Sequence, residues 1–143
     1  FALAFHKNSY VGRTFIKPTQ KERESAVHLK LSVLSSVVKG KRLVLIDDSI
    51  VRGTTMASLI RMLKDAGATE VHVRISSPPF LFPCYYGTDV PSNDQLIASS
   101  HTAAEICASI GADSLGYMKL EDLKQMTGDL PLCKACFDSH YPV

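Results

Sequence analysis

The sequence lacks long apolar runs, blocks of like charge and internal repeats. No apolar stretch approaches the length that crosses a bilayer, and the first residues lack the basic start and cleavage site of a signal peptide. The formal net charge is only +2, without the Lys and Arg clusters of proteins that bind nucleic acids or membrane surfaces. We therefore expect a cytoplasmic protein without a nucleic-acid or membrane partner.

Cysteine is scarce too, and four residues without a secretory signal argue against a disulfide framework and for reduced thiols or a metal site. Cys133 and Cys136 form a C-x-x-C pair, which by itself specifies neither zinc, iron–sulfur nor redox chemistry. Cys84 lies in an irregular segment, whereas Cys107 lies on an apolar helix stripe and is expected to be a small buried core residue. A zinc site made by all four thiolates is the alternative.

The chain is long enough, at 143 residues and 45% hydrophobic, for one core. Apolar β-branched runs at residues 43–46 and 71–75 predict two strands. A helix is predicted between them, with Gly67 as its stop, from the apolar stripe of Met56, Leu59, Ile60 and Leu63. A crossover of this length predicts parallel strands joined right-handedly.

Two capping boxes predict further helices. Thr19 and Glu22 predict one that runs through Val27, followed by a strand at residues 29–34. Thr102 and Glu105 predict another, whose apolar stripe is Ala103, Ile106, Cys107 and Ile110.

Three other segments complete the expected organisation. Residues 115–118 are predicted to form a short strand. Residues 7–14 and 77–94 fit neither a helical nor a strand period, and their Gly, Pro, Ser, Asn and Tyr content predicts loops. Their length suggests function.

A carboxylate pair, Asp47 and Asp48, follows the first strand, and Gly53, Thr54 and Thr55 follow at the start of the helix. This is where open α/β sheets bind ligands. Gly53 allows close approach of the backbone, and the helix N-terminus favours a phosphate. The carboxylates suit ribose hydroxyls or a hydrated Mg²⁺. The alternative is that the pair only starts a turn and caps the helix.

Residues 46–55 resemble the phosphoribosyl-pyrophosphate (PRPP) motif of the type I phosphoribosyltransferase family. The resemblance implies an α/β fold with a parallel sheet flanked by helices, incomplete at the N-terminal side. It implies that the loop holds the 5-phosphate and that the acidic pair addresses the ribose hydroxyls directly or through Mg²⁺. The expected PRPP-binding residues are Asp47, Asp48, Ser49, Arg52, Gly53, Thr54 and Thr55.

Longer runs at residues 7–16, 47–55, 66–74, 77–79 and 85–89 resemble the amidophosphoribosyltransferases. The resemblance implies that glutamine-derived ammonia displaces pyrophosphate from PRPP to give 5-phosphoribosylamine, the first committed step of purine (IMP) biosynthesis. Cationic side chains would stabilise the leaving group, and Lys7, Arg13 and Arg52 are the candidates.

The family resemblance also divides the chain into functional segments. It makes residues 1–18 a flexible active-site loop that closes over substrate, with Tyr10, Arg13 and Ile16 lining the ammonia passage and Lys7, Tyr10 and Arg13 as catalytic candidates. Residues 43–76 are the β-α-β unit with the PRPP motif. Residues 77–143 form a cysteine-containing region.

The cluster-containing branch of this family implies a [4Fe–4S] cluster held by Cys84, Cys133 and Cys136, with a fourth ligand upstream of this chain. It also implies an upstream glutaminase domain on the same polypeptide, together with earlier strands of the transferase domain and a pyrophosphate-binding loop. Because these are missing from the chain, we expect it to be inactive alone. We further expect a homo-oligomer. The alternatives are another type I phosphoribosyltransferase and a regulatory module that binds PRPP.

Overall fold

The computed structural model describes residues 1–7, 31–88, 90, 92–128 and 130–142. Strands β3 (Arg42–Asp47), β4 (Glu70–Ile75) and β5 (Ser114–Tyr117) form a parallel sheet in the order β3-β4-β5. This confirms the two strands expected from the apolar runs and the short strand expected at residues 115–118. All three end at the same edge of the sheet, because parallel strands share one direction.

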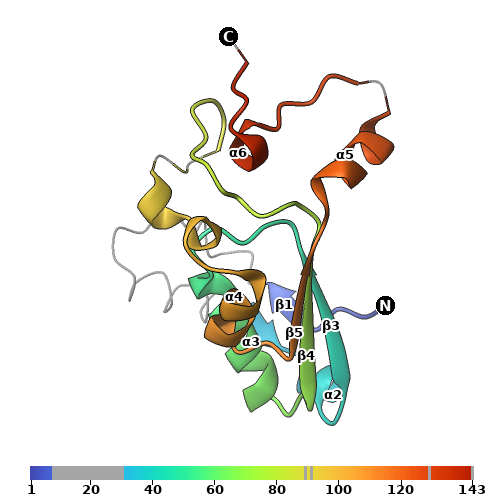
Figure 1. The fold of residues 1–143 in the computed structure, drawn as a ribbon. Coiled ribbons are helices and arrows are strands. Elements are labelled where there is room, and N and C mark those ends of the chain that lie inside the picture. The colour runs from blue at the N-terminus through green and yellow to red at the C-terminus, as the bar shows by residue number, and fades with distance from the viewer. Residues whose placement is uncertain (8–30, 89, 91, 129, 143) are drawn as a thin grey trace.

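Helices α3 (Thr54–Asp65) and α4 (Ala103–Ile110) cover one face of this sheet (Figure 1). The predicted stripe of α3 is buried against β4, with Ile60 and Leu63 each 1% exposed. Burying such a side chain contributes roughly 1.5–3 kcal/mol. After α3 the chain turns at Gly67, whose φ of 96° favours glycine. The predicted β-α-β unit and the α/β fold class are confirmed.

The predicted capping box of α4 is present. The Thr102 N–H donates to Glu105 Oε2 at 2.7 Å, and the Glu105 N–H donates to Thr102 Oγ1 at 3.3 Å. Within the predicted stripe, Ile106 and Ile110 are buried, but Ala103, the first residue of the helix, is exposed. Cys107 is half-buried, and its thiol donates to the Ala112 carbonyl at 3.3 Å.

The other face of the sheet is open on β3. Val44 is 62% exposed and Ile46 is 69% exposed, while Leu43 and Leu45 alternate with them and pack against the core. On the same open face of β4, His72 joins Glu70 to Ser114 by hydrogen bonds of 2.8 and 2.9 Å. The helices α3 and α4 therefore cover only one side of the sheet.

Several short elements complete the described part of the chain. They are the antiparallel pair β1 (Phe5–Lys7) and β2 (Leu31–Val33), helices α2 (Ser35–Val38), α5 (Leu120–Thr127) and α6 (Ala135–Asp138), and 3₁₀ turns η1 (Asn93–Gln95) and η2 (Ile97–Ser99). The predicted strand at residues 29–34 is confirmed only as β2. The helix predicted from Thr19 lies outside the described residues. Among the described helices, none combines the length and the hydropathy of a membrane-spanning segment.

Candidate functional site

The carboxylate pair lies at the carboxyl edge of the sheet. Asp47 ends β3, and its carbonyl accepts the Ser76 N–H from the segment after β4 at 3.0 Å. The Asp48 N–H donates to Asp47 Oδ1 at 2.9 Å, and Ser49 Oγ donates to Asp48 Oδ1 at 3.1 Å. These bonds leave other carboxylate oxygens available to a ligand.

The two carboxylates differ in their surroundings. Asp47 is half-buried whereas Asp48 is exposed. Burial raises the pKa of Asp47, the neighbouring Asp48 charge raises it further, and the bond from the Asp48 N–H opposes both. A cation at this edge would favour the ionised form of Asp47, because it would offset the burial and the like charge. The oxygen donors present are of the kind that Mg²⁺ prefers.

The loop of residues 48–53, here called the 48–53 loop, leads into α3 through Gly53. Gly53 has φ 79° and ψ −17°, and no side chain caps the helix there. The N–H groups of Thr54 and Thr55 belong to the first turn, where intrahelical acceptors do not exist. The positive end of a 12-residue helix and these N–H groups form a suitable place for an anion.

Two hydroxyl groups at this edge were not singled out from the sequence. Tyr117 ends β5 opposite Ile75, and Ser77 follows β4. Among the described residues, both hydroxyl oxygens are buried and have no hydrogen-bond partner. Burial raises the pKa of the Tyr117 phenol. A polar ligand would supply the partner that such groups usually have. The pairing of β5 with β4 places Tyr117 beside the end of β4, and Ser77 follows that end by two residues.

The cysteine segments of the C-terminal region are docked on one another. The N–H groups of Leu81 and Phe82 both donate to the Cys136 carbonyl, at 2.9 and 3.0 Å. The rings of Phe80 and Phe137 have centroids 5.1 Å apart, and Tyr141 Oη donates to the Pro83 carbonyl at 2.7 Å. The structure thus brings residues 80–83 beside residues 136–141.

The surroundings of Cys84 and Cys136 shift the pKa values of their thiols. N–H groups of Tyr86, Thr88 and Gly87 lower the pKa of Cys84 to about 7. Burial raises the pKa of Cys136, and the nearby Cys84 and Cys133 thiolates add to that effect. The donor chemistry fits a soft metal or an iron–sulfur cluster, because such groups take thiolates. Among the described residues, however, no three His, Cys, Asp or Glu side chains are gathered closely enough to hold a metal ion.

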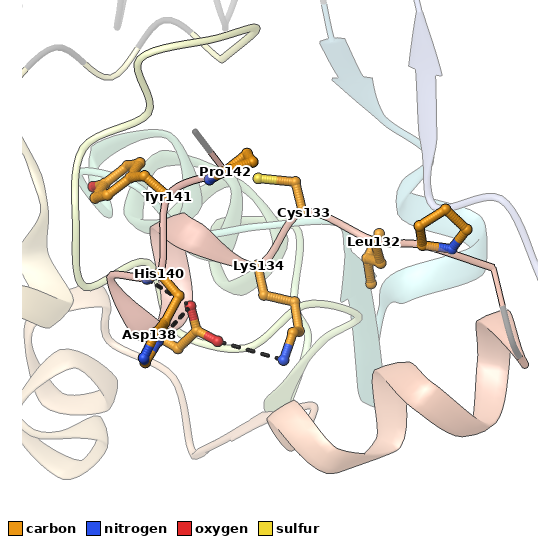
Figure 2. A pocket seen from close by; sticks show the side chains of 8 residues that line it. Leu132, Cys133, Lys134, Asp138, His140, Tyr141 and Pro142 are labelled. Carbon is orange, nitrogen blue, oxygen red and sulfur yellow. Dashed lines mark hydrogen bonds and ion pairs between the residues drawn. The ribbon is translucent and has the colours of Figure 1, made fainter.

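A pocket of about 550 Å³ is formed by the C-terminal tail, residues 131–142. Figure 2 shows Cys133 on its lining together with the ion pair between Lys134 Nζ and Asp138 Oδ2, 3.4 Å apart. All its lining residues lie between 131 and 142, and none belongs to the 48–53 loop.

The structure places the remaining candidates unevenly. Lys7 ends β1, whereas Tyr10, Arg13 and Ile16 lie outside the described residues. Arg52 is exposed on the 48–53 loop, and its Nη2 donates to Gln95 Oε1. Sequence reasoning missed Gln95, because 43 residues separate the partners.

Residues 5–76 match the family model described as the phosphoribosyl transferase domain. Among curated relatives, the amidophosphoribosyltransferase of Synechocystis sp. is 52% identical and aligns with 100% of this chain and 29% of its own length. That of Bacillus subtilis is 51% identical over 99% of this chain and 31% of its own length. The chain thus spans less than a third of these relatives.

A solved structure agrees with the sequence relatives. Glutamine PRPP amidotransferase from B. subtilis, complexed with ADP and GMP, superimposes with a TM-score of 0.82 at 52% identity. The alignment covers 99% of this chain and 32% of that protein. The parallel sheet with its flanking helices therefore matches the fold of that enzyme.

Proposed function

Because this chain belongs to the phosphoribosyl transferase domain family, we propose that it forms the PRPP-binding part of an amidophosphoribosyltransferase. The whole protein would transfer glutamine-derived ammonia to PRPP in the first step of purine biosynthesis. The observation that carries this proposal is the carboxylate pair at the edge of a parallel sheet, followed by a glycine-led helix N-terminus.

Different residues bind the different parts of PRPP. The N–H groups of Thr54 and Thr55 hold the 5-phosphate, since they lie at the positive end of α3. Asp47 and Asp48 accept hydrogen bonds from the ribose hydroxyls, and the hydrogen bond from Ser49 Oγ orients the Asp48 carboxylate. These carboxylates would also hold Mg²⁺, which when bound neutralises charge on the pyrophosphate. Arg52 supplies a further positive charge.

The rest of the assignment rests on the resemblance to the relatives. Lys7, at the end of β1, and Tyr10 and Arg13, outside the described residues, act in the closure of the active site over PRPP, which excludes water from the reacting sugar. Cys84, Cys133 and Cys136 ligate a [4Fe–4S] cluster, completed by a ligand outside this chain. An upstream glutaminase domain supplies ammonia, the whole protein is a homo-oligomer, and it works in the cytoplasm.

The test is pyrophosphate release from PRPP with Mg²⁺ and ammonium, using the full-length polypeptide that contains this chain. Asp47→Asn combined with Asp48→Asn is expected to lower the rate by about 100-fold, because the ribose and metal lose their ionised partners. The control is Asp65→Asn, an exposed aspartate at the far end of α3, which should leave the rate unchanged. Equal rates in the double variant and the wild type would refute the proposal.

A further inference from the structure

A segment far along the chain lies against the 48–53 loop. The Ile97 N–H donates to the Val51 carbonyl at 2.9 Å, and Ile97 Cδ1 lies 3.2 Å from where a Cβ on Gly53 would be. Leu96 beside it is 1% exposed, and Ser99 Oγ closes the segment onto the Leu96 carbonyl at 2.7 Å. Residues 93–99 are therefore anchored in the core and also support the loop.

The same segment presents Gln95 to Arg52. Arg52 Nη2 donates to Gln95 Oε1, and Gln95 is half-buried while Arg52 is exposed. In the part of the chain that the structure describes, Arg52 forms no ion pair with a carboxylate. A neutral amide oxygen orients a guanidinium without cancelling its charge. Among the described residues, Arg52 thus has no counter-charge, and its other N–H groups are open to another partner.

We propose that Gln95 is a positioning residue, which holds Arg52 ready for a phosphate group of the phosphoribosyl ligand bound on the 48–53 loop. The inference rests on the proposed function of that loop. Gln95 acts only through Arg52. An arginine on an exposed loop otherwise samples many rotamers, and binding would have to restrict them. Because Ile97 holds the backbone of the 48–53 loop and Gln95 holds the Arg52 side chain, the rotamers of Arg52 are already restricted before the ligand binds.

The experiment is a double-mutant cycle in the full-length polypeptide, with KM and kcat for PRPP measured at saturating Mg²⁺ and ammonium. Gln95→Ala is expected to raise KM by roughly tenfold and to leave kcat nearly unchanged, since ground-state and transition-state binding are weakened together. Gln95→Ala added to Arg52→Ala should have no further effect, because Gln95 acts only through Arg52. Gln95→Glu keeps the acceptor oxygen but adds a negative charge that offsets the charge of Arg52, so its KM should lie between those of the wild type and Gln95→Ala.

Gln125→Ala, in an exposed position on α5, is the matched control and should not change KM. Calorimetric titration of the wild type and Gln95→Ala with PRPP, ribose 5-phosphate and inorganic pyrophosphate distinguishes the 5-phosphate from the pyrophosphate as the partner of Arg52. Weaker binding of either fragment by Gln95→Ala supports the proposal. Wild-type protein that fails to bind PRPP would overturn the proposed function itself. Wild-type binding with an unchanged KM in Gln95→Ala, or additive effects in the cycle, would overturn only the assignment of Gln95.

Discussion

The sheet region and the C-terminal tail are held together in different ways. In the sheet region, Val71 and Val73 are fully buried, and Ile60 packs on them at 1% exposure. In residues 118–142, α5 buries no residue and α6 buries only Ala135, while Leu130 remains 72% exposed. The first region carries its own core, whereas the described part of the tail depends on a few hydrogen bonds and ring contacts.

This contrast bears on the proposed cluster. The tail's contacts lead to residues 80–86, which include Cys84. A group that binds Cys84, Cys133 and Cys136 would tie together segments that already touch but share little buried apolar area. Metal binding would then replace hydrophobic burial as the main stabilising term of the tail.

Loss of a cysteine ligand would show whether the tail holds a cluster. In the full-length polypeptide, Cys133→Ala is expected to abolish iron and sulfide binding, because a thiolate ligand is lost. Cys107→Ala is the control and should keep both, since that thiol is half-buried in α4 and bonds the Ala112 carbonyl. Iron and labile sulfide are measured on purified protein. Equal loss in both variants would add Cys107 to the ligand set, and zinc in place of iron would contradict the cluster.

The next effect tests the packing difference directly. Ile60→Ala should lower the free energy of unfolding by about 2–5 kcal/mol, because it leaves a cavity between α3 and the sheet. Leu130→Ala removes an exposed side chain and should change it by no more than about 0.5 kcal/mol. Urea titration followed by circular dichroism measures both. Similar losses for the two variants would mean that another part of the protein covers Leu130.

A smaller loss of stability is expected from removing one hydrogen bond at the edge of the sheet. Asp113 Oδ2 accepts the N–H of the buried Val71 at 2.7 Å and lies 3.2 Å from Lys64 Nζ. Asp113→Ala leaves that N–H unpaired and should cost about 1–3 kcal/mol, whereas Asp113→Asn retains an acceptor and should cost less. Thermal unfolding at neutral pH compares the two, and an equal cost would exclude the hydrogen bond as the cause.

The Asp113 carboxylate should also make the stability of the protein depend on pH. The Val71 N–H, and then Lys64, lower the pKa of Asp113 below the usual aspartate range. A lowered pKa means that the folded state favours the ionised form, so the stabilisation is complete at neutral pH. It is lost as the pH falls through the folded-state pKa. Wild-type stability should therefore decrease more steeply in acid than that of Asp113→Asn, and parallel curves would contradict this.

Much of the fold was predictable because its signals are local. The stripe of Met56, Ile60 and Leu63 and the apolar runs around it predicted β3, α3 and β4, and the Thr102 capping box predicted the start of α4. The short helices α5 and α6 were not predicted, since brief elements on an exposed tail carry little periodicity. The roles predicted for Tyr10 and Arg13 stay predictions, because both residues lie outside the described part of the chain.

The carboxylate pair, the glycine before α3 and the family of the chain could all be identified from residue type and spacing. Three contacts became visible only in the folded chain: Gln95 with Arg52, Tyr117 opposite Ile75 at the site edge, and the Cys84 segment with the Cys136 segment. The partners in these contacts are far apart along the chain. Local periodicity selects helices and strands, but contacts between residues 42 to 58 positions apart depend on how those elements pack.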